Sequence, residues 1–374
     1  MGLAQGVLLK EQMTKFLKAT NYYLVSQVTE ELPGKWLPPA AVDLIDLALV
    51  KGMNNLLDKY AEFTDPFTPQ SNFDEMRGLA DGSGIDYDAI HRLNLFPEVS
   101  KASCSFFGAW GEATTGGKTF QLRALDYITD AKSFTDNPLV IVYHPSAESS
   151  VAHASVAWPG TVGVLTGFSA AKLGISEIGV YFSDDSFGQG TDDTPPEKVK
   201  GQPWMSVLKD VASKAHNVDE ALKIIEDADR TCNLIIGVGD GNAGSAYGVE
   251  YSGYVAVPYN DTTLLPVNDT WHPQIPSVVY NGMDWDCPTY TQALGEQLAK
   301  FHGSIDETTI VHDILPTVQT GNLHVAVADL TDMNWHISFA RRTTADPSEP
   351  MNGYERQFSR LHMSELFALP APTV

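Results

Sequence analysis

A cysteine at position 104 begins a predicted β-hairpin and is a candidate nucleophile. The hairpin is expected over residues 104–127, and its second strand carries Arg123 and Asp126. If the Ser103–Cys104 peptide bond were cut, the new α-amino group would have an unperturbed pKa of roughly 7.7–8.0. That amine could then accept the proton of its own thiol, as in enzymes whose Thr nucleophile uses its own N-terminal amine. The pattern therefore suits a nucleophile that is released by self-cleavage.

Each of these residues also has a structural interpretation. Cys104 could be a buried structural cysteine at the start of a strand, and Arg123 and Asp126 could form an ion pair at a strand end. Strand alternation places Arg123 on the face of Leu125 and Tyr127, and Asp126 on the opposite face. Only a twist or bulge between them would bring Arg123 and Asp126 to one face.

The residues before Cys104 are predicted to be mostly helical, because apolar positions recur at helical spacing. The pattern changes at Cys104 to short β-like runs separated by Pro and Gly, with helices between some of them. Such an order favours an α+β fold with two antiparallel sheets flanked by helices over a parallel βαβ sheet. Helices are expected over 3–31, 40–62, 72–80, 86–94, 203–215, 218–228, 289–301 and 305–314, and strands over 139–143, 151–158, 162–168, 178–183, 233–238, 246–251, 325–330 and 335–340.

The charge of the chain excludes several classes of partner. The 374 residues include 24 Lys and Arg and 47 Asp and Glu, which gives a net charge of −23. Such a surface repels phosphate backbones, so we expect no nucleic-acid partner. No segment approaches the ~20 apolar residues of a membrane span. None of the ten histidines has a partner at metal-ligand spacing, so no metal or other cofactor is expected.

Cysteines and sequons bear on the compartment. Cys232 and Cys287 could form a disulfide in a secreted protein and leave Cys104 as the odd thiol, whereas all three would be free in the cytosol. Two sequons, at Asn260 and Asn268, favour a secreted or lysosomal-like glycoprotein. The acidic charge suits an acidic compartment or a salty one, and a cytoplasmic location stays open.

Several stretches resemble the penicillin acyltransferase-like branch of the N-terminal nucleophile (Ntn) hydrolases, which is related to choloylglycine hydrolases and acid ceramidases. Residues 73–94 resemble the end of the family's propeptide. Residues 103–126, ending in Arg-Ala-Leu-Asp, resemble its cysteine hairpin, which ends in "RNxD". Residues 231–250, beginning Thr-Cys-Asn, resemble a third family block, and 158–180 resemble a weaker fourth.

The resemblance implies a fold and a division of the chain. The fold would be the Ntn-hydrolase αββα sandwich, in which two antiparallel sheets are flanked by helices. Residues 1–103 would form a helical propeptide that stays bound as a small subunit, and residues 104–374 the catalytic large subunit. The protein would then be made as a zymogen that cleaves itself.

The resemblance also implies roles for four residues. Cys104 would be the nucleophile, and Asp126 would hold the new α-amino group. Arg123 would favour the thiolate, since a nearby cation lowers the pKa of a thiol. Asn233 would donate to the oxyanion, a role whose loss costs roughly 2.7–4 kcal/mol. Taken alone, without the resemblance, Asn233 is better interpreted as a turn residue at a strand start.

Two departures from the family pattern bear on the reaction. Ala124 and Ser176 stand where the family commonly has Asn, which leaves efficient self-processing and the substrate class open. We expect hydrolysis of a linear N-acyl amide through an acyl-enzyme, or transfer of the acyl group to an amine. Phe106, Phe107 and Trp110 could line an apolar acyl pocket, or they could pack in the core, as such aromatic residues usually do in a sandwich of two sheets.

Two alternatives to this function remain. One is a lipid hydrolase of the acid ceramidase or phospholipase B-like kind, with a lipid-like substrate. The other is a non-catalytic binding protein that kept the fold. The sequence assigns no oligomeric state.

Overall fold

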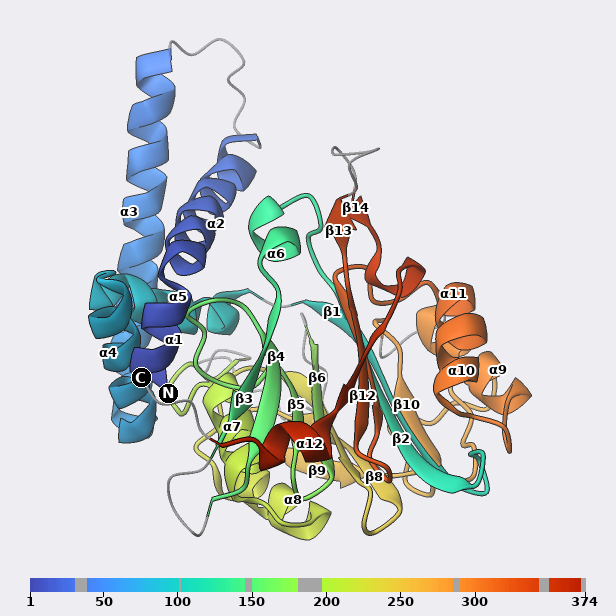
Figure 1. Cartoon of the computed structure of the whole chain (residues 1–374). Coiled ribbons are helices and arrows are strands. Elements are labelled where there is room, and N and C mark those ends of the chain that lie inside the picture. Colours follow the sequence, from blue (N-terminus) through green and yellow to red (C-terminus); the bar gives the residue numbers. More distant parts are fainter. Residues whose placement is uncertain are drawn as a thin grey trace.

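The computed structural model describes residues 1–30, 39–100, 102–144, 150–180, 197–284, 289–342 and 350–370. Its N-terminal part is helical and lies at one end of the molecule (Figure 1). These elements are α1 (Gly2–Leu8), α2 (Lys10–Glu30), α3 (Pro39–Thr64), the 3₁₀ helix η1 (Asp65–Phe67), α4 (Gln70–Ser83) and α5 (Tyr87–Val99).

Two large antiparallel sheets form the centre of the molecule, as the hairpin pattern predicted. The nucleophile sheet has six strands, in the spatial order β10 (Val278–Asn281), β1 (Ser103–Gly111), β2 (Gly117–Asp126), β11 (His324–Asp329), β12 (Asn334–Phe339) and β15 (Ser359–His362). The facing sheet has seven, in the order β3 (Leu139–Tyr143), β4 (His153–Ala157), β5 (Thr166–Ser169), β6 (Leu173–Gly179), β7 (Leu234–Asp240), β8 (Ser245–Tyr251) and β9 (Ala256–Tyr259). A small ribbon pairs β13 (Arg341–Arg342) with β14 (Pro350–Met351).

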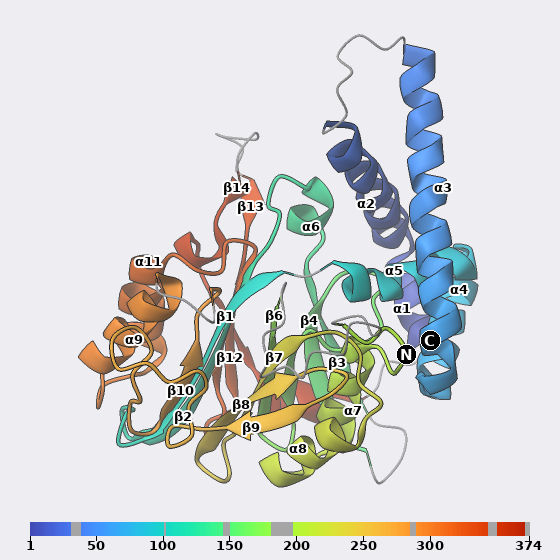
Figure 2. The same cartoon turned by 180° about the vertical axis from the view of Figure 1, so that it is seen from behind.

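Helices cover the outer face of each large sheet (Figures 1 and 2). On the facing sheet these are α7 (Trp204–Lys214) and α8 (Val218–Asp227), whose apolar side chains share a core with β6 to β8. On the nucleophile sheet they are α9 (Tyr290–Lys300), α10 (Glu307–Thr309), the π-helical turn η3 (Ile310–Ile314) and α11 (Leu315–Val318). The remaining short helices are α6 (Lys132–Asp136), η4 (Gly353–Glu355) and α12 (Met363–Ala368). The predicted αββα sandwich is thus confirmed.

The inner faces of the two sheets pack closely where the hairpin crosses β7. Phe106 of β1 is fully buried, and its ring lies against Gly237 of β7. An added Cβ at Gly237 would overlap this ring, so glycine is required for the close approach. The hairpin turn also needs glycine, because Gly116 and Gly117 have φ of 71° and 70°. Close packing here holds β1 rigidly over the facing sheet.

Some predicted elements differ from those observed. The helix expected over 3–31 is divided at Leu9 into α1 and α2, and the strand expected over 162–168 begins only at Thr166, as β5. Of the strand expected over 178–183, residues 181–183 lie outside the described residues, and β6 ends at Gly179. Strand β6 was largely missed because Gly, Ser and Glu interrupt its apolar run, although every residue of it is buried. Strands β9, β10 and β15 were also not expected, since each has only four residues.

Other expectations concern the surface and the compartment. Among the described residues, no helix combines the length and the apolar character of a membrane span. Asn260 and Asn268 lie partly exposed between β9 and β10, and their glycosylation stays a prediction. Cys287 lies outside the described residues, so its pairing with Cys232 stays untested.

Candidate active site

The Cys104 side chain lies fully buried between the two sheets, at the start of β1. Arg123 on the neighbouring strand β2 donates a hydrogen bond from Nη2 to Cys104 Sγ at 3.3 Å. Glu177 of β6 reaches the same sulfur from the facing sheet, with Oε1 4.0 Å from Sγ. The sulfur therefore lies beside one cation and one carboxylate.

Arg123 is held from several sides. Its side chain is only 1% exposed and forms an ion pair with Glu177, with 2.5 Å between Nη2 and Oε1. Its other terminal nitrogen, Nη1, lies 3.1 Å from Nε2 of His324, the first residue of β11. Nε2 of His324 is also 3.1 Å from Oγ1 of Thr166 on β5. A continuous polar chain thus joins Thr166, His324 and Arg123 to Cys104 and Glu177.

Burial affects the pKa of the Cys104 thiol more than the charge of Arg123 does. Arg123 was expected to favour the thiolate of the cleaved enzyme, and in the uncleaved chain burial raises the pKa of the Cys104 thiol well above its usual value. The charge of Arg123 acts to lower this pKa, but Glu177 and Asp126 raise it. Because the chain is continuous through Ser103 and Cys104, this raised pKa belongs to the uncleaved form.

Asp126 lies on the other face of the hairpin, as strand alternation predicted. Cys104 pairs with Leu125 and Ser103 pairs with Asp126, with no bulge at this end of the hairpin. The Asp126 carboxylate accepts hydrogen bonds from Thr320 Oγ1 at 2.6 Å and from the backbone N–H groups of residues 321 and 322 at 2.9 Å. Asp126 therefore does not face the sulfur. It lies opposite Ser103, at the bond that self-cleavage would break.

The pKa of Asp126 gives a test on the uncleaved chain. Burial raises the pKa of this carboxyl, and its hydrogen bonds oppose the rise without cancelling it. A raised folded-state pKa stabilises the fold below the ordinary Asp pKa of about 3.9, and this stabilisation is lost as the pH rises through the folded-state value. Urea unfolding of Cys104→Ala and of Cys104→Ala/Asp126→Asn measures this loss, because only the first keeps the carboxyl. As the pH rises from about 3 to 7, the free energy of unfolding of Cys104→Ala should fall relative to that of the double variant. A difference that is constant with pH, or that changes in the opposite direction, would contradict the raised pKa.

Asn233 comes immediately before β7 and is almost fully buried. The next residue, Leu234, pairs with Gly179 of β6, and the Gly179 N–H donates to the Ala102 carbonyl at 3.2 Å. This ladder places the backbone of Asn233 near the chain that enters Cys104. The Asn233 Oδ1 atom has no hydrogen-bond partner among the described residues. Its role as an oxyanion donor stays a prediction.

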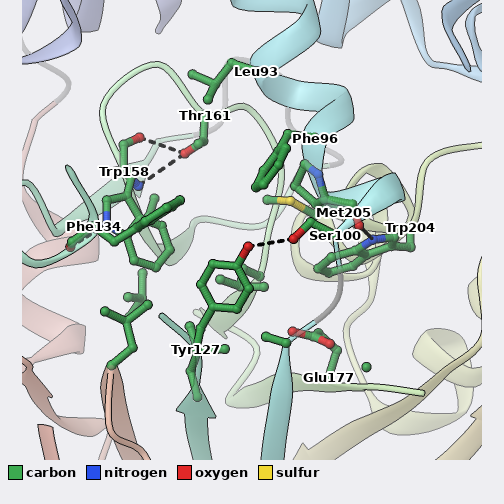
Figure 3. A pocket seen from close by; sticks show the side chains of 18 of the residues that line it. Leu93, Phe96, Ser100, Tyr127, Phe134, Trp158, Thr161, Glu177, Trp204 and Met205 are labelled. Carbon is green, nitrogen blue, oxygen red and sulfur yellow. Dashed lines mark hydrogen bonds between the residues drawn. The ribbon is translucent and has the colours of Figure 1, made fainter. Parts of the chain in front are cut away.

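A largely apolar cavity of about 100 Å³ reaches the site and is bordered by Glu177, Leu125 and Ala102 (Figure 3). Its walls come from both parts of the chain. The N-terminal helices supply Phe16, Leu93 and Phe96, and the part after Cys104 supplies Tyr127, Phe134, Trp158, Trp204 and Met205, among others. Phe106, Phe107 and Trp110 do not line this cavity: Phe106 and Phe107 are buried in the core on opposite faces of β1, and Trp110 is partly buried against that core.

The sequence predicted no role for Glu177 or His324. Glu177 lies in the stretch 158–180 that resembles a family block, and it is a single carboxylate in a fully buried strand, which is a usable signal. His324 has no such signal, because its contacts with Arg123 and Thr166 come from distant strands. Among the described residues, no group of three His, Cys, Asp or Glu could hold a metal ion.

No protein-family model matches the chain. The chain is 34% identical over 383 residues to protein dcd1A of Dictyostelium discoideum, an alignment that covers 98% of this chain and 83% of dcd1A. It is 30% identical over 390 residues to protein dcd1B of the same organism, covering 100% of this chain and 73% of dcd1B. Among solved structures, it is similar to the Caenorhabditis elegans ortholog of N-acylethanolamine-hydrolyzing acid amidase, with a TM-score of 0.44 and 15% identity over 61% of this chain and 93% of that one.

Proposed function

We propose that this chain, which belongs to the family of the Dictyostelium discoideum proteins dcd1A and dcd1B, is a self-processing cysteine amidohydrolase of the N-terminal nucleophile kind. The observation that carries the proposal is the Arg123 guanidinium on the Cys104 sulfur, at the first strand of an αββα sandwich. The site borders an apolar cavity, which suits the acyl group of a substrate.

Cleavage of the Ser103–Cys104 bond would supply the missing base. The new α-amino group of Cys104 takes the thiol proton as the sulfur attacks the substrate's amide carbonyl carbon. The tetrahedral intermediate collapses, the C–N bond breaks, and the amine leaves with that proton. Water then attacks the thioester and gives a carboxylic acid and the free thiol. Asp126 would hold the α-amino group from the opposite side of the hairpin, and Asn233 would donate to the oxyanion.

The cavity favours an apolar acyl group. Aromatic and aliphatic side chains form most of its wall, and Glu177 is a buried carboxylate at its border. A long acyl chain would contact more of this wall than a short one, so the lipid hydrolase alternative shares the same site. Turnover of N-acyl amides with long and short acyl chains separates these two substrate classes.

The segment before Cys104 would stay bound after cleavage. Glu98 of α5 accepts a hydrogen bond from the Trp204 backbone N–H at 2.8 Å, and Trp204 Nε1 donates to the Pro97 carbonyl at 3.0 Å. Ser100 and Tyr127 share a further hydrogen bond of 2.6 Å (Figure 3). These bonds all join residues before the cleavage site to residues after it.

The test is intact mass and N-terminal sequencing of the purified full-length chain, held at acidic and at neutral pH. We expect two fragments that copurify, and the second should begin Cys-Ser-Phe-Phe. A chain that stays whole under both conditions and hydrolyses no N-acyl amide would contradict the proposal and favour the binding-protein alternative.

A further inference from the structure

His324 is the polar neighbour of Arg123 on the side away from Glu177. The imidazole is fully buried, and its Nε2 atom lies 3.1 Å from Arg123 Nη1. The other terminal nitrogen of Arg123, Nη2, contacts both Cys104 and Glu177. Both terminal nitrogens of the guanidinium therefore have hydrogen-bond partners.

Hydrogen-bond chemistry settles the form of the ring. A guanidinium has only donors, so Nε2 of His324 must present its lone pair to Arg123. The ring proton is then on Nδ1, which has no hydrogen-bond partner among the described residues, and the Thr166 hydroxyl at 3.1 Å is a second donor to the single Nε2 lone pair. Burial, together with the charge of Arg123, lowers the pKa of His324 well below its usual value, which agrees with a neutral ring.

We propose that His324 is a positioning residue whose neutral imidazole accepts from Arg123 and keeps the guanidinium against the Cys104 sulfur. This inference rests on the proposed function, in which that sulfur is the nucleophile. Among the described residues, the ring makes hydrogen bonds only through Nε2, and its two partners there are Arg123 and Thr166. Without an acceptor there, the guanidinium is free to turn toward Glu177 and away from the sulfur.

The test compares His324→Leu, which removes the acceptor, with His324→Gln, whose amide oxygen can take the place of Nε2. The matched control is His336→Leu on the next strand, β12. The readout is the rate at which iodoacetamide alkylates Cys104 in the full-length chain, followed by peptide mass, because only the thiolate reacts.

We expect alkylation to slow at least about tenfold in His324→Leu, the equivalent of one pKa unit. It should stay near the native rate in His324→Gln and in His336→Leu. A purely structural role predicts the reverse, since looser packing would expose the thiol and speed alkylation, so an unchanged or faster rate in His324→Leu overturns the proposal. Should that variant fail to fold, His324→Asn replaces it, because its shorter amide falls short of Arg123.

The same samples keep the two proposals apart. Self-cleavage and turnover of the native chain test the function, whereas the order of alkylation rates tests His324 even in a chain that does neither. If the native chain is inactive but the alkylation rates follow the expected order, the proposed function is contradicted and the positioning of Arg123 by His324 is supported.

Discussion

Replacing Cys104 by alanine is expected to abolish both self-cleavage and amide hydrolysis, while the fold is kept. The sulfur is the only atom of this side chain able to attack a carbonyl carbon, and alanine fits the buried space that the side chain leaves. Loss of the nucleophile in a comparable catalytic unit lowers kcat by roughly 10⁶-fold, so turnover should fall below detection. Intact mass measures cleavage, and release of the amine measures turnover.

Cys104→Ser is the matched variant, because it keeps a nucleophilic atom in nearly the same volume. We expect it to retain the fold and to process far more slowly than the native chain, since a hydroxyl is the poorer nucleophile. Thermal unfolding midpoints close to the native value in both variants would show that the fold is intact. Hydrolysis by a well-folded Cys104→Ala protein would contradict the mechanism outright.

Replacing Arg123 by methionine is expected to have the second large effect, on stability and on activity together. Its side chain is 1% exposed, and its guanidinium lies 2.5 Å from the Glu177 carboxylate. Breaking a buried ion pair by removing one partner typically costs about 3–5 kcal/mol. Urea unfolding should show a loss of this order, and turnover should be lost because the sulfur no longer has its cation.

The double variant Arg123→Met/Glu177→Leu separates the two effects. Removing both buried charges should recover most of the stability, and it should not recover turnover. Arg77→Met is the control, since it breaks the exposed Arg77–Asp74 pair and should cost less than about 1 kcal/mol. Turnover by the double variant would show that Arg123 only balances the charge of Glu177, and an undiminished stability in Arg123→Met would contradict the buried pair.

The hairpin was the part of the site most open to prediction. The period-two alternation of a strand placed Arg123 on one face and Asp126 on the other, and the hydrogen bonds of both side chains confirm it. The two antiparallel sheets and their covering helices followed from the order of short strand and helix patterns. Of the two interpretations of Phe106, Phe107 and Trp110, packing in or against the core is the one observed. The cavity has other aromatic residues in its wall, because which side chains face it depends on how the N-terminal helices dock.

The sequence by itself determined the hairpin, the face on which each of its side chains lies, and Cys104 as the candidate nucleophile, because these depend on spacing within one short segment. The tertiary structure alone decided that Glu177 and His324 meet Arg123, and that burial raises the pKa of the thiol in the uncleaved chain. Those contacts join β2 to strands β6 and β11, about 50 and 200 residues away. The pKa of a thiol depends on burial and on every nearby charge, and both exist only once the sheets have packed.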